Sequence, residues 1–190
     1  MSKLPLDSMF RYIDSGRLFR QPFQILYYVF GVLMALFSLY SLSYWYDLSE
    51  YAGGVMYVYM FLMGLVVIAI AAFTVIFWFR RAGDLINDMP NNARFQAIPA
   101  VSNLLITFGE WLGICGAIVT FSGGILGALL LSWDAYDSGD AFLGFLAMAV
   151  IGVIICYLIL VFFRLIGEQI LAIGVIANNT RKIMHNTEHK

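Results

Sequence analysis

The stretch "AFLGFLAMAVIGVIICYLILVFFR", residues 141–164, decides the fold, because 23 uncharged and mostly apolar residues precede Arg164. A helix needs about 20 such residues to cross a hydrocarbon core about 30 Å thick. Working outward from this stretch, we find the segments of that kind at 23–45, 54–79, 105–132 and 142–163. The chain of 190 residues is 62% hydrophobic and 12% charged, whereas soluble domains carry about 25% charged residues. The sequence therefore predicts an all-α integral membrane protein with four transmembrane helices.

The distribution of charge predicts the orientation in the membrane. All eleven Lys and Arg residues lie on one side of a four-span arrangement, and short loops that carry positive charge stay in the cytoplasm. The loops on the other side carry only acidic residues, namely Asp47, Glu50, Asp134, Asp137 and Asp140. We therefore predict a multi-pass protein of the cell inner membrane, surrounded by membrane lipids, with both termini in the cytoplasm.

The spans and the segments between them divide the chain into five parts. These are a cytoplasmic amphipathic segment at 1–22, a first transmembrane hairpin at 23–86, a cytoplasmic linker at 87–97, a second transmembrane hairpin with cytoplasmic helical extensions at 98–180, and a cytoplasmic tail at 181–190.

The two ends of this division rest on residue patterns next to the outermost spans. Apolar and charged residues alternate at 8–20, which indicates a short helix at the membrane surface that ends at Pro22; a plain solvated tail is the alternative. Residues 165–177 stay mostly apolar beyond the last span. We expect this helix to continue past the membrane, to pack against a similar continuation of the third span or against a partner, and to end at the polar residues 178–182.

A short repeat links the ends of the second and fourth spans. "FWFRRAGDLI" (77–86) and "VFFRLIGEQI" (161–170) share the form aromatic–aromatic–Arg–x–x–Gly–acid, and "VFGVL" (29–33) weakly matches "TFGEW" (107–111). The match predicts two tandem hairpins related by a pseudo-twofold axis along the membrane normal, with chance similarity of boundary residues as the rival interpretation. In each motif the basic and acidic residues are four apart and can pair on one helix face; they are Arg80 with Asp84 and Arg164 with Glu168.

Three charged residues form a predicted cluster near the cytoplasmic face. Glu110 and Arg164 lie at nearly equal counts from the loop between their spans, so an antiparallel hairpin places them at the same depth. We expect an ion pair between them, with Glu168 one turn further into the cytoplasm. Two alternatives remain: each side chain reaches separately into the head groups, or the cluster is a functional proton or ion site.

Small residues at helical spacing on the third span predict a face for close helix packing. The face consists of Gly113, Ala117, Thr120, Gly124 and Gly127, with Gly144, Ala149 and Gly152 as partners on the fourth span. Two tryptophans, Trp78 and Trp111, are expected to anchor the inner membrane boundary.

The last span also carries a family resemblance. Arg164 and Glu168, followed by Ile176 and Asn179, resemble the end of an uncharacterised bacterial two-span membrane domain. The approach to the first span is similar to the start of that family at Phe10, Asp14, Pro22 and Tyr28. The resemblance covers half of the chain, and the four predicted spans resemble a doubled form. No activity is established for such domains, so the resemblance implies a bacterial cytoplasmic-membrane protein and no more.

The sequence predicts no catalysis, cofactor, metal or nucleic acid. The tail from His185 to His189 matches the His-x-x-Glu-His pattern of some zinc proteases, but no third ligand accompanies it. We expect a non-enzymatic membrane subunit that self-assembles or scaffolds a larger complex, because the apolar extensions and the small-residue face need partner helices. The alternative is a small oligomeric channel or transporter that uses the charged cluster.

Labelling of single cysteines in intact cells tests the orientation. An impermeant thiol reagent added from outside should modify Asp134→Cys and leave Arg94→Cys unmodified, because only the acidic loops are expected outside. Modification of Arg94→Cys in intact cells would overturn the topology.

Overall fold

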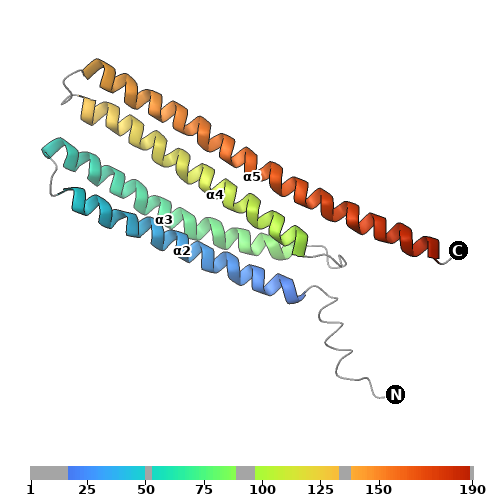
Figure 1. Cartoon of the computed structure of the whole chain (residues 1–190). Coiled ribbons are helices and arrows are strands. Elements are labelled where there is room, and N and C mark those ends of the chain that lie inside the picture. The colour runs from blue at the N-terminus through green and yellow to red at the C-terminus, as the bar shows by residue number, and fades with distance from the viewer. Residues whose placement is uncertain (1–16, 50–52, 89–96, 133–137, 189–190) are drawn as a thin grey trace.

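The computed structural model describes residues 17–49, 53–88, 97–132 and 138–188, and within these ranges every long element is a helix (Figure 1). The elements are α2 (Arg17–Ser49), α3 (Gly54–Asp88), α4 (Ala97–Leu126), a π-helical turn η1 (Gly127–Leu131) and α5 (Ser138–Glu188). Four of them are long and apolar enough to cross a membrane. The prediction of an all-α chain with four such helices is confirmed for the described residues.

Two predicted helix ends are wrong. The helix expected to end at Pro22 instead continues through it, and α2 runs without a break from Arg17. Pro22 has no backbone N–H to donate to the preceding turn, so α2 lacks one helical hydrogen bond there, and the helix continues on both sides of it. The polar residues 178–182 do not end α5, which continues to Glu188. Residues 178–188 contain neither glycine nor proline, the two residue types that most strongly disfavour a helix.

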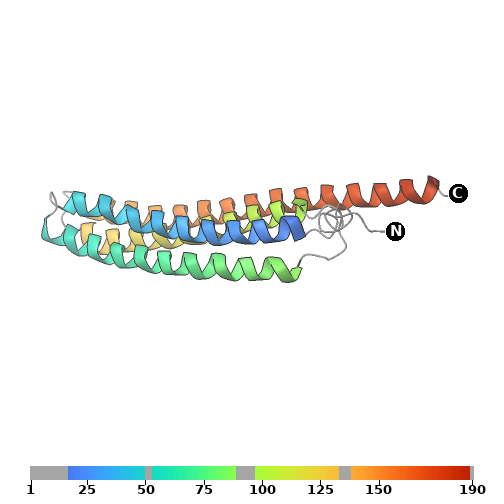
Figure 2. The same cartoon turned by 90° about the horizontal axis from the view of Figure 1, so that it is seen from below.

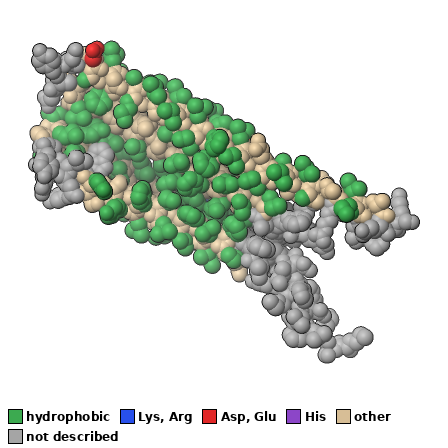
Figure 3. All heavy atoms as spheres, viewed as in Figure 1, with side chains coloured by type: hydrophobic (Ala, Val, Ile, Leu, Met, Phe, Trp, Pro, Cys, Tyr) green, Lys and Arg blue, Asp and Glu red, His purple; other side chains and the backbone are tan. Residues whose placement is uncertain are grey.

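The helices form two closely packed pairs (Figures 1 and 2). α2 packs along α3, α4 packs along α5, and α3 with a smaller share of α2 joins the first pair to α4. α5 contacts α4 and η1 but reaches neither α2 nor α3. Apolar side chains cover most of the face drawn in Figure 3, as expected for a surface in contact with lipid tails.

The contact between α4 and α5 is close because glycines of each helix face backbone or bulky side chains of the other. A β-carbon added at Gly124 would lie 2.5 Å from Ala149 Cβ and 2.7 Å from the Phe145 carbonyl oxygen. At Gly152 an added β-carbon would lie 2.6 Å from Thr120 Cβ. No side chain fits at such distances, so the two backbones approach each other in the manner of small-residue faces of membrane helices.

Most residues of the predicted packing face lie at this contact. Gly113, Thr120 and Gly124 of α4 and Gly127 of η1 meet α5, and Ala149 and Gly152 of α5 meet α4. Ala117 is half-buried. The prediction is wrong for Gly144, where an added β-carbon would meet nothing within 4 Å.

The same contact continues beyond the spans that the sequence predicts at 105–132 and 142–163. Gly167 packs against Ile106, and Ser102 Oγ donates a hydrogen bond to the Gly167 carbonyl oxygen at 2.6 Å. Further along, a β-carbon added at Gly174 would lie 2.9 Å from Ile98 Cγ2. α4 and α5 therefore pack against each other as far as Gly174. That this part of the two helices lies outside the membrane stays a prediction.

Two glycine-to-alanine variants of the α4–α5 hairpin test this packing. Gly124→Ala should lower the free energy of unfolding in detergent by about 1–3 kcal/mol, because the added methyl group forces the backbones apart. Gly144→Ala is the matched control, and it should be neutral or stabilising by up to about 1 kcal/mol, since alanine favours the helix and meets open space. Equal effects of the two substitutions would contradict the close contact.

Candidate functional site

An ion pair joins the two helix pairs. The Arg81 guanidinium of α3 donates a hydrogen bond to the Glu110 carboxylate of α4, and the side chains are 39% and 16% exposed. The guanidinium carbon also lies 5.7 Å from the centre of the Phe77 ring, within the range of a cation–π interaction. Glu110 is thus held by a residue of α3.

The predicted ion pair between Glu110 and Arg164 is wrong. Arg164 Nε instead donates to Glu168 Oε1 of its own helix at 3.3 Å, and both of these side chains are more than half exposed. The residues of α4 and α5 that do meet at this depth are Gly109 and Phe163. Glu110 and Arg164 each follow one residue later, which turns them by about 100° around their helix axes. Counting residues gave the correct depth, but it did not give the direction of the side chains.

The two i,i+4 ion pairs that the repeat predicts, Arg164 with Glu168 and Arg80 with Asp84, differ in the structure. The i,i+4 pair of Arg164 and Glu168 is confirmed, whereas Arg80 and Asp84 are both exposed and form no ion pair with each other. Asp84 instead lines a pocket between α2, α3 and α4. The cluster predicted from Glu110, Arg164 and Glu168 is therefore divided between two places, the inside of the bundle and the outer face of α5.

Three side-chain contacts, which we call the polar junction, connect the two helix pairs. They are the ion pair of Arg81 with Glu110, the hydrogen bond of Trp111 Nε1 to Thr74 Oγ1 at 2.9 Å, and the contact of Tyr27 Oη with Thr107 Oγ1 at 3.4 Å. Each contact has one member on α4 and the other on α2 or α3.

The hydrogen bond at Thr74 has a defined direction. Thr74 is fully buried, and its hydroxyl donates to the Ile70 carbonyl oxygen at 2.7 Å. The threonine proton is therefore in use, and the oxygen accepts from the Trp111 indole. A buried hydroxyl with both roles filled fixes the position of α4 against α3.

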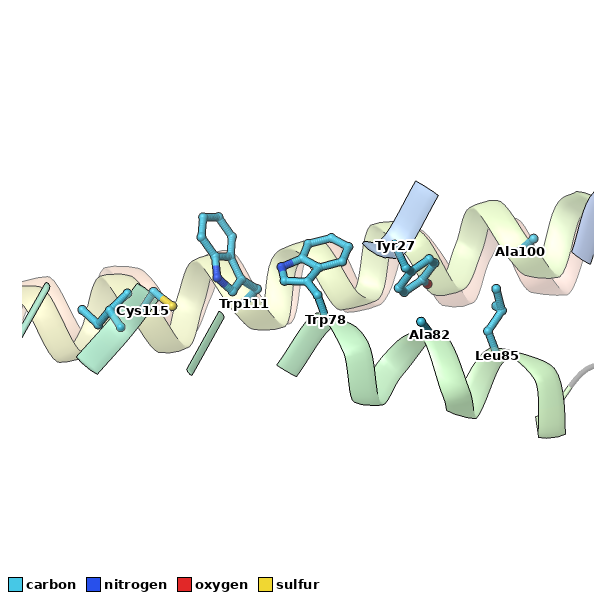
Figure 4. Close-up of a cluster of buried hydrophobic side chains, with 8 residues drawn as sticks. Tyr27, Trp78, Ala82, Leu85, Ala100, Trp111 and Cys115 are labelled. Carbon is cyan, nitrogen blue, oxygen red and sulfur yellow. The ribbon is translucent and has the colours of Figure 1, made fainter. Parts of the chain in front are cut away.

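Trp78 and Trp111 are core residues, and their predicted role as anchors at the membrane boundary is wrong (Figure 4). Trp78 is fully buried, with the Tyr27 ring edge-on at 5.5 Å and the Phe30 ring stacked at 5.7 Å between centroids. Within the described ranges the Trp78 indole nitrogen has no hydrogen-bond partner, and in Figure 4 it lies on the side of the ring nearer Trp111. These aromatic side chains pack the two helix pairs together next to the polar junction.

A polar pocket of about 60 Å³ opens beside the polar junction. Five of its lining residues are polar and two are apolar: Tyr27, Arg81, Asp84, Asn103 and Thr107, with Leu85 and Ile106. One buried water needs about 10–15 Å³ on the same kind of measure. The pocket therefore has room for several waters or for a small polar group.

The C-terminal end of α5 extends past its partner helix (Figure 1). α4 begins at Ala97, and its first residues meet α5 near Gly174, whereas α5 continues to Glu188. Ile173, Ile176 and Ile183 are 64–67% exposed in this region. Their spacing of three and seven residues places them on one side of the helix, and we call them the α5 apolar stripe.

Comparisons with known proteins give no match. No family model, no curated protein and no solved structure is similar to this chain. The resemblance to a doubled two-span membrane domain therefore stays a prediction.

Sequence reasoning missed several members of the site. Arg81 directly follows Arg80, and the repeat points to Arg80 and not to Arg81. Thr74 and Thr107 are each flanked by apolar residues in the sequence. A polar group inside a membrane bundle needs a partner, so this position of the two hydroxyls could have indicated a hydrogen bond between helices.

A double-mutant cycle on Arg81→Gln and Glu110→Gln tests the ion pair. Because the two residues are in contact, the loss of unfolding free energy in the double variant should be smaller than the sum of the losses in the two single variants, by about 1 kcal/mol in detergent. Arg164→Gln provides the control, and its effect should add to that of Glu110→Gln without coupling. Coupling of Glu110 to Arg164, or none to Arg81, would contradict the observed pairing.

Proposed function

We propose that this chain is a non-enzymatic integral membrane subunit that self-assembles or scaffolds a larger membrane complex. The observation that carries the proposal is the α5 apolar stripe, which extends beyond α4 and leaves Ile176 and Ile183 exposed. A helical segment of about 12 residues is marginal in water without tertiary packing. Its one-sided apolar stripe is of the kind that docks against another helix or in an apolar groove.

The stripe lies on the side of α5 away from α4. Gly174 faces α4 through Ile98, and at about 100° per residue Ile176 is turned by about 160° from that direction. A partner on the stripe therefore does not compete with the intramolecular contact of α4 and α5.

The proposed setting is the cell inner membrane, with both termini and the C-terminal part of α5 in the cytoplasm. Support comes from the basic residues and from helix length. Arg80 lies 26 residues after the start of α3 at Gly54, and Arg164 lies 26 residues after the start of α5 at Ser138. Both distances correspond to about 39 Å of helix, which exceeds a hydrocarbon core of about 30 Å.

We also propose that the two helix pairs are tandem hairpins of common origin. Gly31 of α2 packs against Trp78 and Phe79, and Gly109 of α4 packs against Phe163, so the "FG" repeat meets the aromatic repeat in both pairs. The pairs differ at the next glycine of the motif, since Gly167 is packed and Gly83 faces open space.

The alternative function is a small oligomeric channel or transporter. It has less support, because Arg164 and Glu168 lie on the exposed side of α5 and do not join Glu110 in a common polar path. The polar pocket is the feature that would favour a channel or transporter. Two of its described lining residues, Leu85 and Ile106, are however apolar, so the lining is not a continuous polar path.

The mass of the purified full chain in mild detergent tests the assembly role. We expect a protein mass above the 21.4 kDa of one chain, from further copies or from a co-purifying chain. Ile176→Lys should return the chain to 21.4 kDa, because a lysine in the middle of the stripe cannot be buried without a large desolvation penalty.

The matched control is Val175→Lys, an exposed neighbour that is turned by about 100° from Ile176 and by about 160° from Ile173 around α5. This variant should keep the mass of the original assembly. A wild-type chain that is monomeric with no bound partner, or equal disruption by both lysines, would contradict the proposal.

A further inference from the structure

The polar pocket beside the polar junction has unused hydrogen-bonding groups of both kinds. We infer that it binds a phosphoethanolamine group, supplied by a lipid head group or by the free molecule. This inference goes beyond the assembly role and does not depend on it.

The depth of the pocket matches the head-group layer. Arg81 lies 27 residues after Gly54 at the other end of α3, which corresponds to about 40 Å of helix. The hydrocarbon core is about 30 Å thick, and the polar layers extend the bilayer to about 40–45 Å. The pocket residues Tyr27, Asp84 and Asn103 come from three helices that meet at this level.

The charges of the pocket favour an ammonium group. The positive charge of Arg81 is offset by Glu110, its ion-pair partner. Asp84 also lines the pocket, and within the described part of the chain its carboxylate forms no ion pair. Arg81 and Glu110 therefore offset each other, which leaves the Asp84 carboxylate to attract a cation. Arg80, four residues before Asp84, is exposed and is not among the described lining residues.

The neutral groups add acceptors for the ammonium protons. Asn103 is half-buried, and among the described residues its side chain has no hydrogen-bond partner. The hydroxyl oxygens of Tyr27 and Thr107 contact each other at 3.4 Å and border the same space. A primary ammonium has three donors, which the Asp84 carboxylate, the Asn103 amide oxygen and one of these hydroxyls can accept.

Arg81 supplies the matching site for a phosphate. A guanidinium carries five N–H donors, and only Nη2 is engaged with Glu110. The side chain is 39% exposed, so its remaining donors are accessible to a phosphate oxygen. Arg81 and Asp84 are three residues apart on α3, and they present opposite charges on one helix face.

The same geometry disfavours other common head groups. A trimethylammonium group has no N–H donor and is recognised by aromatic cages, whereas Tyr27 is the one aromatic residue among the lining residues described. A phosphate group without an amine would leave the Asp84 carboxylate without an ion-pair partner, because the Arg81 guanidinium is paired with Glu110. A primary amine linked to a phosphate satisfies both Asp84 and Arg81.

Native mass spectrometry of the full chain tests the inference. The purified protein is mixed with equal amounts of phosphatidylethanolamine, phosphatidylcholine and phosphatidylglycerol that carry identical acyl chains. We expect phosphatidylethanolamine adducts to exceed the other two by about tenfold, the effect of one charge-assisted hydrogen bond. Asp84→Asn should remove this preference, Asp84→Glu should restore part of it, and Asp140→Asn, at the opposite end of the helices, should leave it unchanged.

Free phosphoethanolamine separates the two sources of the ligand. If it displaces the phosphatidylethanolamine adduct, the pocket recognises the head group alone; if it does not, the acyl chains are needed and the ligand is the lipid. Equal adducts of the three lipids on the wild-type chain, or a preference that survives Asp84→Asn, would overturn the inference. Neither result would affect the assembly role, which is judged from protein mass.

Discussion

The close backbone contact between α4 and α5 is the constraint on which the rest of the structure depends. Helices in a membrane gain little from the hydrophobic effect, so their association relies on van der Waals contact. Glycines on both helices bring the backbones together from Gly127 to Gly174. This contact fixes the rotation of α4 about its axis. Because Gly109 faces α5, the neighbouring Glu110 turns to α3, where it meets Arg81.

The polar junction provides specificity more than strength. Hydrogen bonds between membrane helices contribute about 0.6 kcal/mol on average. Three different polar contacts nevertheless fit only one register of α4 against α2 and α3. The aromatic side chains around Trp78 fill the space beside these contacts. Packing therefore holds each pair together, and the polar groups define how the pairs meet.

The sequence predicted what depends on hydrophobicity and periodicity, and it missed what depends on the rotation of helices. The four apolar helices and the small-residue face follow from residue type at a regular spacing, as at Gly113 and Gly124. The partner of Glu110 depends on an angle that no residue count contains. Trp78 and Trp111 were misplaced for a related reason. Tryptophan suits both a membrane boundary and a core, and only the packing of all helices decides between them.

The length of α5 has a mechanical consequence. Its 51 residues form one helix without proline, about 75 Å from end to end. The part of α5 that lies alongside α4 is supported by it, and the part beyond Gly174 is in contact with no other described helix. A small tilt of the part held by α4 therefore moves the free end of α5 further than the held part, in proportion to the distance along the helix. Any molecule bound near Ile183 would be displaced by rearrangements that begin deep in the bilayer, with no further moving element between them.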